Sequence, residues 1–219
     1  MNYLITVFTK YGIKEAALFS GSSITIGTGF GDTIRMPGKL DDSHIKLTHT
    51  KTGLYMSSKA DVMTAEGTTT SCMLALESTV QITSGISFAV FEARVGDEPP
   101  VLIAGQNEVS IGRSKKNDIC LPGGLVSSKH AVLINTDGNW TIIDAGSKNG
   151  TYVSGKRVDR MQLTDHSSIF ISGWKLLYKS ERLHFENQPG SPVCAKKFDI
   201  QDAEASALSP IKHIKIFNV

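Results

Sequence analysis

The chain has 219 residues, of which 40% are hydrophobic and 20% are charged, and its formal net charge is +2. This length is enough for one or two domains with their own cores, and the composition excludes a disordered tail, a coiled coil and a collagen-like rod. The charges are spread along the chain without a basic block, which disfavours nucleic acid as a partner. No apolar run approaches the roughly 20 residues needed to cross a bilayer.

The amino-terminal residues and the cysteines indicate where in the cell the protein is expected. Residues 1–7 contain no basic residue, and Lys10 follows too soon for the apolar stretch of a signal peptide. The three cysteines are an odd number without a C-x-x-C pair, which fits reduced thiols and predicts neither a disulfide framework nor a metal site. We therefore expect a cytoplasmic protein without metal or cofactor, in which no part of this segment inserts into a membrane.

Short strands separated by turn residues are predicted through most of the chain. Residues 4–9 alternate between the two faces of a strand, and further runs rich in β-branched and aromatic residues follow between clusters of Gly, Asp, Asn and Ser. The regular spacing predicts an all-β fold built from antiparallel sandwiches. One short segment, Asp202–Leu208, is the best helix candidate. The further strands are expected at 23–26, 44–47, 80–82, 88–91, 101–104, 109–111, 130–134, 140–143 and 169–171.

An internal repeat divides the chain into two copies of one sandwich. Three short motifs recur in the same order 85 to 88 residues later, a drift that small loop insertions explain. We predict one copy at 1–93, a linker at 94–100, a second copy at 101–181 and a tail at 182–219. The linker contains two prolines and turn formers. The recurring motifs are Thr25-Ile26-Gly27 with Ser110-Ile111-Gly112, Asp42-Ser43-His44 with Ser128-Lys129-His130, and residues 81–85 with 170–173.

Three motifs in the second copy stand where strands should end in loops: Gly112-Arg113-Ser114, Ser127-Ser128-Lys129-His130 and Asn149-Gly150-Thr151. Together with residues 117–119 and 169–173, they resemble a forkhead-associated (FHA) domain over about 101–180. The resemblance implies a β-sandwich that binds a phosphothreonine-containing protein or peptide with the loops at one end.

The resemblance also implies which residues bind the phosphopeptide. Arg113 would be the main phosphate ligand, because the planar fork of a guanidinium matches phosphate oxygens. Ser127 would add a hydroxyl, and Ser128 and Lys148 are candidate second contacts. Asn149 would hydrogen-bond the peptide main chain beside the phosphothreonine.

Three further residues are expected to support the site rather than touch the ligand. The resemblance implies that His130 braces a loop. Gly112 precedes the arginine, and Gly150 would adopt a turn conformation that is closed to residues with a Cβ.

Two near-matches to catalytic motifs do not make a case for an enzyme. Gly150 and Gly155-Lys156 have P-loop spacing, but Arg157 stands where a Ser or Thr should hold magnesium, and no helix is predicted to follow. Ser127, His130 and Asp144 are the residue types of a hydrolase triad, but the chain has no G-x-S-x-G elbow. We expect a protein that binds and does not catalyse.

The first copy resembles the same domain with its site removed. Thr28 replaces the arginine, Asp41 falls opposite Ser127, and Glu66 falls opposite Asn149 if a gap is allowed. Two carboxylates would repel a phosphate. We therefore expect a degenerate FHA-like domain, and we expect residues 101–181 to bind phosphopeptide without help from the first copy.

A degenerate FHA-like domain followed directly by a second FHA domain resembles the amino-terminal region of EssC-type proteins, the membrane-anchored FtsK/SpoIIIE ATPases of type VII secretion. Residues 169–177 are similar to the closing strands of that region. The resemblance implies a piece of a longer protein that recruits or regulates a partner at the inner face of the cell membrane, as part of a larger membrane-anchored complex. The alternative is a pair of structural domains that assemble a secretion complex and bind no phosphopeptide.

Overall fold

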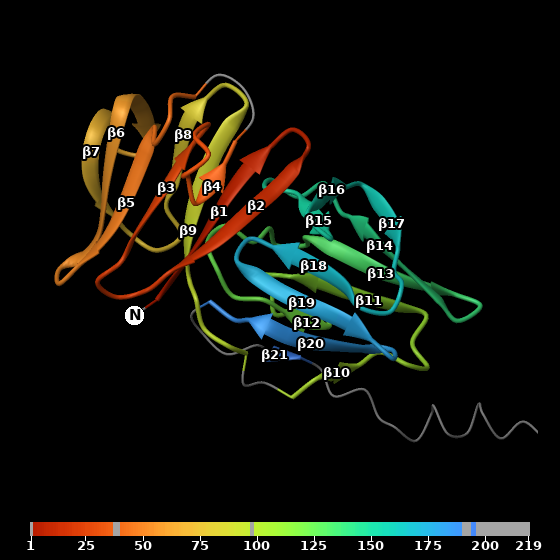
Figure 1. The fold of residues 1–219 in the computed structure, drawn as a ribbon. Helices are drawn as coiled ribbons and strands as arrows, with labels where there is room; N and C mark the ends of the chain where they lie inside the picture. Colours follow the sequence, from red (N-terminus) through yellow and green to blue (C-terminus); the bar gives the residue numbers. More distant parts are fainter. Residues whose placement is uncertain (1, 37–39, 97–98, 190–193, 196–219) are drawn as a thin grey trace, which may run out of the picture.

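The computed structural model describes residues 2–36, 40–96, 99–189 and 194–195 and contains two β-sandwiches packed side by side (Figure 1). The described residues form strands and turns, so the all-β fold class is confirmed. None of them forms a helix long and apolar enough to span a membrane.

The first domain is a nine-stranded sheet that wraps around one core. Its strand order is β2-β1-β9-β8-β6-β5-β3-β4, and β7 pairs with β6. Ile5 and Val7 of β1 are fully buried, as are Ile45 and Leu47 of β5, because alternate residues of each strand face the interior. The strands are β1 Tyr3–Thr9, β2 Gly12–Leu18, β3 Ser23–Gly27, β4 Ile34–Arg35, β5 Ile45–Thr50, β6 Gly53–Thr64, β7 Gly67–Leu74, β8 Thr79–Thr83 and β9 Ile86–Glu92.

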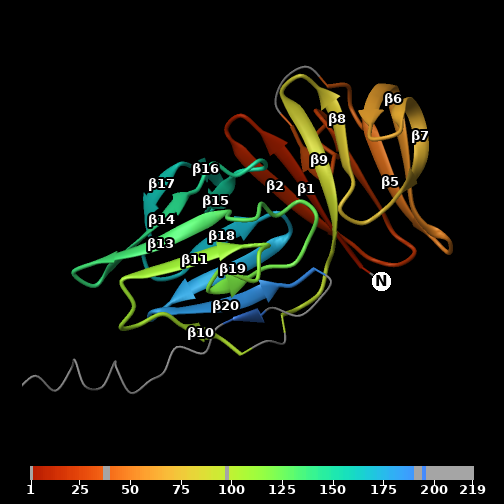
Figure 2. The ribbon, with the colours of Figure 1, turned by 180° about the vertical axis from the view of Figure 1, so that it is seen from behind.

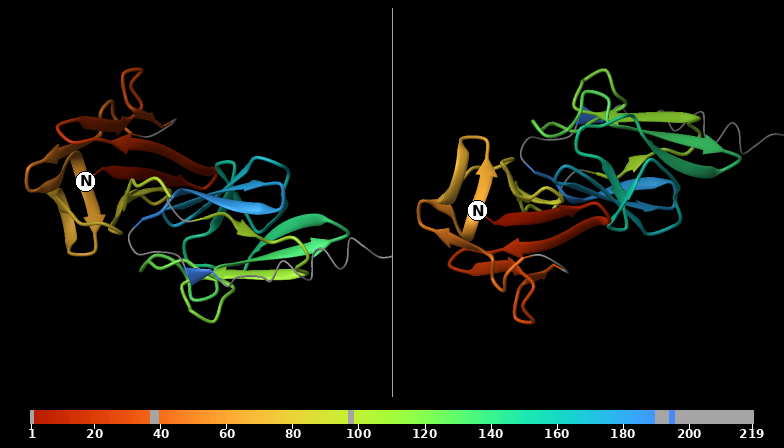
Figure 3. Two further views of the ribbon diagram at one scale, coloured as in Figure 1. Left: turned by 90° about the horizontal axis from the view of Figure 1, so that it is seen from below. Right: turned by 90° about the horizontal axis from the view of Figure 1, so that it is seen from above.

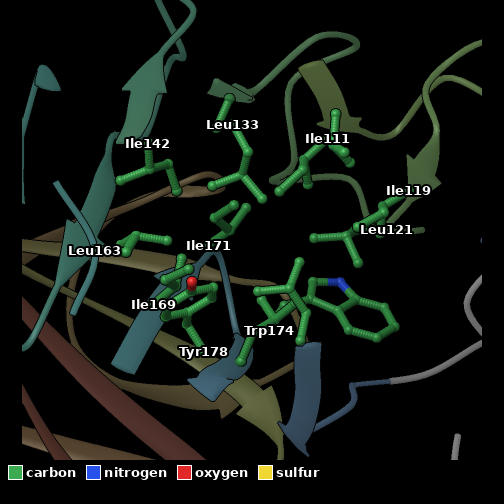
Figure 4. Close-up of a cluster of buried hydrophobic side chains, with 14 of the residues drawn as sticks. Ile111, Ile119, Leu121, Leu133, Ile142, Leu163, Ile169, Ile171, Trp174 and Tyr178 are labelled. Carbon is green, nitrogen blue, oxygen red and sulfur yellow. The ribbon is translucent and has the colours of Figure 1, made fainter. Parts of the chain in front are cut away.

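The second domain consists of two six-stranded sheets, with orders β10-β20-β19-β18-β15-β16 and β17-β14-β13-β11-β12-β21. Apolar side chains from both sheets meet in its core, where Ile111, Leu133 and Trp174 are fully buried (Figure 4). The strands are β10 Val101–Leu102, β11 Glu108–Gly112, β12 Ile119–Cys120, β13 Ala131–Thr136, β14 Asn139–Asp144, β15 Thr151–Val153, β16 Lys156–Val158, β17 Arg160–Gln162, β18 Ser167–Ile171, β19 Trp174–Lys179, β20 Arg182–Asn187 and β21 Cys194–Ala195.

The strand registers of the two domains correspond residue by residue at the repeated motifs. In the first domain, Ile26 pairs with Ile34 in a parallel bridge and with Ile45 in an antiparallel one. In the second domain, Ile111 pairs in the same two ways with Ile119 and Ala131. The prediction of two tandem copies of one sandwich is confirmed.

One position in the sheet is filled by the amino-terminal strand in the first domain and by a carboxy-terminal strand in the second. In the first domain, β1 lies between β2 and β9, whereas in the second domain β20 lies between β10 and β19. Residues 182–187 are therefore a strand of the second sandwich, and their assignment to a tail is wrong. Leu183 and Phe185 alternate into the core, where they are 0% and 5% exposed. The helix candidate at 202–208 lies outside the described residues.

The two domains contact each other directly through aromatic side chains. Phe8 of β1 lies 5.8 Å from Tyr152 of β15, and Phe91 of β9 lies 6.0 Å from Phe170 of β18, measured between ring centroids. The β1–β2 hairpin runs along the second domain (Figures 2 and 3), where the N–H of Ile13 donates to the carbonyl of Gly155 at 2.8 Å. The domains are thus joined by a packed interface as well as by the chain between them.

That connecting segment is itself fixed to the second domain. The N–H of Arg94 donates to Asn187 Oδ1 at 2.9 Å, and Asn187 Nδ2 donates to the carbonyl of Glu92 at 3.2 Å. Asn187 is buried at the end of β20, so the strand that completes the second sandwich also anchors the end of the first.

Candidate functional site

The three loop motifs of the second domain come together at one end of the sandwich. The loop after β11 contacts the loop before β13, because the N–H of Arg113 donates to the carbonyl of Ser127 at 2.9 Å. The loop before β15 contacts the same residue, since the N–H of Lys148 donates to Ser127 Oγ at 3.0 Å. Ser127 is therefore the junction of all three loops.

The Arg113 side chain is exposed and held in place by one bond. Its Nε donates to the carbonyl of Val126 at 3.1 Å, which fixes the guanidinium beside Ser127. A guanidinium has five N–H donors, so this bond leaves others for an anion. Ser128 and Lys148 are also exposed, so a hydroxyl and a second cation flank the same loop end.

His130 links the second loop to the third from a fully buried position. Its Nδ1 accepts the N–H of Ser127 at 3.1 Å, so the ring proton is on Nε2, which donates to the carbonyl of Gly150 at 3.2 Å. Burial lowers the pKa of His130, against the bond to Gly150 and the nearby charge of Asp144, which raise it. The imidazole is therefore neutral at pH 7, which is the form that both bonds require.

Ser127, His130 and Asp144 do not form a catalytic triad in the structure. The nitrogen of His130 that is nearest Ser127 bonds the backbone N–H of that residue, and the other nitrogen bonds Gly150. Neither ring nitrogen is hydrogen-bonded to the serine hydroxyl or to Asp144, so these residues lack the geometry of nucleophilic catalysis.

Asp144 organises the third loop, a role that the sequence analysis missed. Its carboxylate accepts the N–H and the hydroxyl of Ser147 at 2.8 and 2.6 Å, and the hydroxyl of Thr151 at 2.7 Å. Burial raises the pKa of Asp144, but these bonds outweigh it and the net pKa is lowered. The D-x-x-S pattern at the end of a strand, typical of a side chain that caps a turn, is the signal that could have identified it.

Asn149 and Gly150 follow in that loop. Asn149 Nδ2 donates to the carbonyl of Leu125 at 2.7 Å, and the Tyr152 hydroxyl donates to the carbonyl of Asn149 at 3.1 Å. Gly150 has a φ of +84°, and a Cβ there would lie 2.8 Å from Arg157 Nε, so a side chain would be both strained and crowded.

The first two loops approach each other closely at Gly112 and Asn117. A Cβ on Gly112 would lie 2.5 Å from the carbonyl oxygen of Ser128, which explains the glycine without a special φ. The buried Asn117 side chain donates to the carbonyls of Ser114 and Ser128 at 2.8 and 2.7 Å. These contacts give the exposed donors of the site a fixed backbone, as tight recognition of a small anion requires.

The first domain keeps this frame without the ligand residues. The N–H of Thr28 donates to the carbonyl of Asp41 at 3.2 Å, and the N–H of Asp41 lies 3.5 Å from His44 Nδ1, as in the Arg113, Ser127 and His130 arrangement. The Thr28 hydroxyl turns back onto its own loops, where it bonds Leu40 and Asp42.

An arginine does lie near this end of the first domain, although it comes from another position. Arg35 of β4 donates its Nε to the carbonyl of Thr28 at 3.3 Å, and its guanidinium lies 4.0 Å over the Phe30 ring. In the second domain the equivalent residue is Cys120, whose position in β12 is fixed by pairing with Gly112. The guanidinium of Arg35 is thus committed to the surface of its own domain.

The third loop is missing from the first domain. Ser58 corresponds to Asp144 and Met63 to Val153 by their strand partners, and four residues separate the first pair where eight separate the second. Glu66 lies in the turn between β6 and β7, which the Thr64–Gly67 pair closes. The sequence pairing of Glu66 with Asn149 is therefore wrong, because a shorter loop shifts the alignment.

Residues 109–172 match the family model of the FHA domain, so the second sandwich is an FHA domain. FHA domains are interaction modules. The chain is 40% identical over 83 residues to the ABC transporter ATP-binding/permease protein Rv1747 of Mycobacterium tuberculosis, a match that covers 38% of this chain and 9% of that protein. It is 36% identical over 69 residues to the transcriptional regulatory protein EmbR of the same organism, covering 27% of this chain and 18% of EmbR. The chain spans less than a fifth of either relative.

Two solved structures extend the comparison. The N-terminal FHA domain from EssC, a component of the bacterial type VII secretion apparatus, superposes with a TM-score of 0.62 at 12% identity, and the match covers 88% of this chain and 100% of that one. This likeness shows that both sandwiches share the fold of the EssC region. EmbR in complex with a low-affinity phosphopeptide matches 39% of this chain and 21% of its own at 30% identity, with a TM-score of 0.30.

Proposed function

We propose that the second domain binds a phosphothreonine-containing segment of a partner protein, and that Arg113 is the main phosphate ligand. The observation that carries the proposal is the junction at Ser127, which joins the loops of Arg113, Lys148 and Asn149 at one end of an FHA sandwich. The FHA relative EmbR, which has been solved with a bound phosphopeptide, supports the same class of ligand.

Each residue of the proposed site has donors or acceptors to spare. Ser127 Oγ accepts from Lys148 N, so its own proton is free to point at a phosphate oxygen. Lys148 and Ser128 flank it: Lys148 adds its positive charge to that of Arg113 against a phosphate of about −1.5 to −2, and Ser128 adds a neutral hydroxyl. The Asn149 amide uses one N–H on Leu125, so its oxygen and its second N–H can bond the peptide main chain.

Titration with a degenerate phosphothreonine peptide library, with the unphosphorylated library beside it, tests this proposal. Arg113→Ala should abolish measurable phosphopeptide binding, since charge-assisted hydrogen bonds to a phosphate are worth about 1.5–3 kcal/mol each. The melting temperature should hardly change, because an exposed loop charge contributes little to folding. Arg160→Ala, which removes an exposed arginine from β17, is the matched control and should bind as the wild type does.

Equal binding of the phosphorylated and unphosphorylated libraries by the wild type would overturn the proposal. It would favour the second candidate, a structural pair of domains within an assembly. That candidate is supported by the first domain, which keeps the loop frame and lacks the third loop.

We further propose that the chain is the cytosolic amino-terminal region of a type VII secretion ATPase, held at the inner face of the membrane by a remainder of the protein. The support is the order of the domains, a degenerate sandwich before an FHA domain that retains its loop residues, together with the shared fold of the EssC region. Sequencing the gene tests it: the open reading frame should continue into transmembrane segments and FtsK/SpoIIIE-type ATPase modules. A stop codon directly after Val219 would contradict it.

A further inference from the structure

A groove lies between the two domains beside the proposed phosphate site. It consists of two adjoining hollows with volumes of about 650 and 200 Å³. We call the two hollows together the interdomain groove, and six residues line both of them. Three come from the first domain, Phe8, Thr79 and Ser87, and three from the second, Asn149, Tyr152 and Arg157.

The interdomain groove is continuous with the proposed site. Asn149 belongs to both, and Lys148, whose N–H bonds the Ser127 hydroxyl, lines the smaller hollow. A peptide main chain that passes Asn149 beside its phosphothreonine therefore enters the groove within a few residues. There it meets side chains of the first domain, which has no phosphate site of its own.

The charge of the groove is of one sign. Lys10, Lys148 and Arg157 are exposed and line it, whereas none of the described residues that line either hollow is an aspartate or a glutamate. Hydroxyl and amide groups, such as those of Thr79, Ser87 and Gln81, make up much of the rest. This lining complements an acidic or polar peptide segment rather than a basic one.

The walls of the groove are held by contacts across the domain interface. Phe8 packs on Tyr152, and the Tyr152 hydroxyl bonds the carbonyl of Asn149. Glu77 of the first domain accepts the N–H of Gly124, in the loop whose Leu125 carbonyl holds Asn149. Because both walls are fixed before a ligand arrives, little conformational entropy is lost on binding.

Resting on the function proposed above, we propose that the interdomain groove binds the part of the partner peptide that flanks the phosphothreonine, and that it selects an acidic residue there. The first domain is then a specificity element: it reads the neighbouring sequence, and the second domain reads the phosphate.

Full-length variants test this inference with a phosphothreonine peptide whose flanking positions are replaced one at a time by Glu, Ala or Lys. The wild type should bind the best Glu peptide about fivefold more tightly than its Ala counterpart, the scale of one partly exposed charge pair. Lys10→Glu should remove or invert this preference, and Lys46→Glu, an exposed lysine of β5, is the matched control that should keep it. Thr79→Trp should fill the groove and weaken the long peptide by a similar factor.

A short phosphothreonine tripeptide separates the two proposals. Its affinity should be the same for the wild type, Lys10→Glu and Thr79→Trp, because it does not reach the groove, and Arg113→Ala should abolish it. If Arg113→Ala abolishes binding while both groove variants keep the wild-type preference and affinity, the groove inference is wrong and the proposed function stands. If no phosphorylated peptide binds better than its unphosphorylated form, both are wrong.

Discussion

The loop ends of the two domains share a frame and differ in what the frame holds. In each domain a histidine contacts the backbone N–H of the residue three positions before it, and the first two loops are bonded through the same pair of backbone groups. Only the second domain has the third loop with Asn149. It also has an arginine directly after β11, whereas a threonine follows the equivalent strand β3 of the first domain. The frame therefore belongs to the fold, and its presence alone does not indicate a phosphate site.

The comparison also shows how such a site is removed. Replacement of Arg113 by a threonine would take away the main donor, but the four-residue shorter connection removes a whole wall of the site. The bonds that Asp144 makes to Ser147 and Thr151 belong to the longer connection, and in the first domain Ser58 stands at the position of Asp144. Loss of the loop is thus the more decisive of the two differences.

The largest effect is expected from ending the second domain at residue 181. This truncation removes β20 from between β10 and β19, and with it the buried side chains of Leu183 and Phe185. A fragment of residues 101–181 should lack a cooperative thermal transition, since loss of each large core side chain costs about 2–5 kcal/mol. Circular dichroism and amide NMR spectra test this, with a fragment of residues 101–195 as the control.

A folded 101–181 fragment that binds phosphopeptide as the full chain does would contradict this prediction. It would restore the domain boundary expected from the sequence and would also argue against any part for the first domain in binding.

A smaller effect is expected from acid, which should weaken the second domain through His130. Because the folded-state pKa of His130 is lowered, its unfolded form binds a proton first, so this contribution is complete above about pH 6.5 and is lost as the pH falls. Asp144 also has a lowered pKa, so its contribution persists to lower pH and is lost below about pH 4. The melting temperature should fall from pH 7 to pH 5, and less so in His130→Gln. An equal fall in both proteins would show that another group causes it.

The smallest effect is expected from restoring an arginine to the first domain. Thr28→Arg in an Arg113→Ala background should bind no more phosphopeptide than Arg113→Ala alone. The third loop is still missing, and Asp42, which now bonds the Thr28 hydroxyl, would pair with the introduced guanidinium. Titration with the phosphopeptide library measures this, beside a Thr28→Ala control. Recovered binding would show that the two loop ends are more alike than their registers indicate.

Much of this comparison could be predicted from the sequence, because the repeated motifs are turns with strict backbone requirements. Position 112 requires a glycine because the backbone of Ser128 lies so close, and position 150 requires one because its φ is positive. Glycines at these positions therefore indicate the fold from the sequence. The three ligand loops were found in the same way, since each motif closes a strand and the strands bring their ends together.

The features that could not be predicted from the sequence depend on contacts between residues that are distant along the chain. The strand β20 has no motif of its own, and only its neighbours β10 and β19 reveal that it completes a sheet. Residues 12–18 show no clear alternation of apolar and polar types, yet they form β2 because β1 pairs with them along its whole length. The interdomain groove was equally hidden, since Phe8 and Tyr152 are 144 positions apart.

The first sandwich takes the strand beside β9 from its amino-terminal end, as β1, and the second takes the equivalent strand from its carboxy-terminal end, as β20. The two domains are therefore completed at different times during synthesis. The first domain has every strand of its sheet once residue 92 has left the ribosome, whereas the second must wait for residue 195, the end of β21. At about 5–20 residues per second, this leaves an interval on the order of 10 s in which a complete first domain displays Phe8 and Phe91 without their aromatic partners in place. The finished first sandwich is then a surface on which Tyr152 and Phe170 can settle as the remainder of the nascent chain emerges.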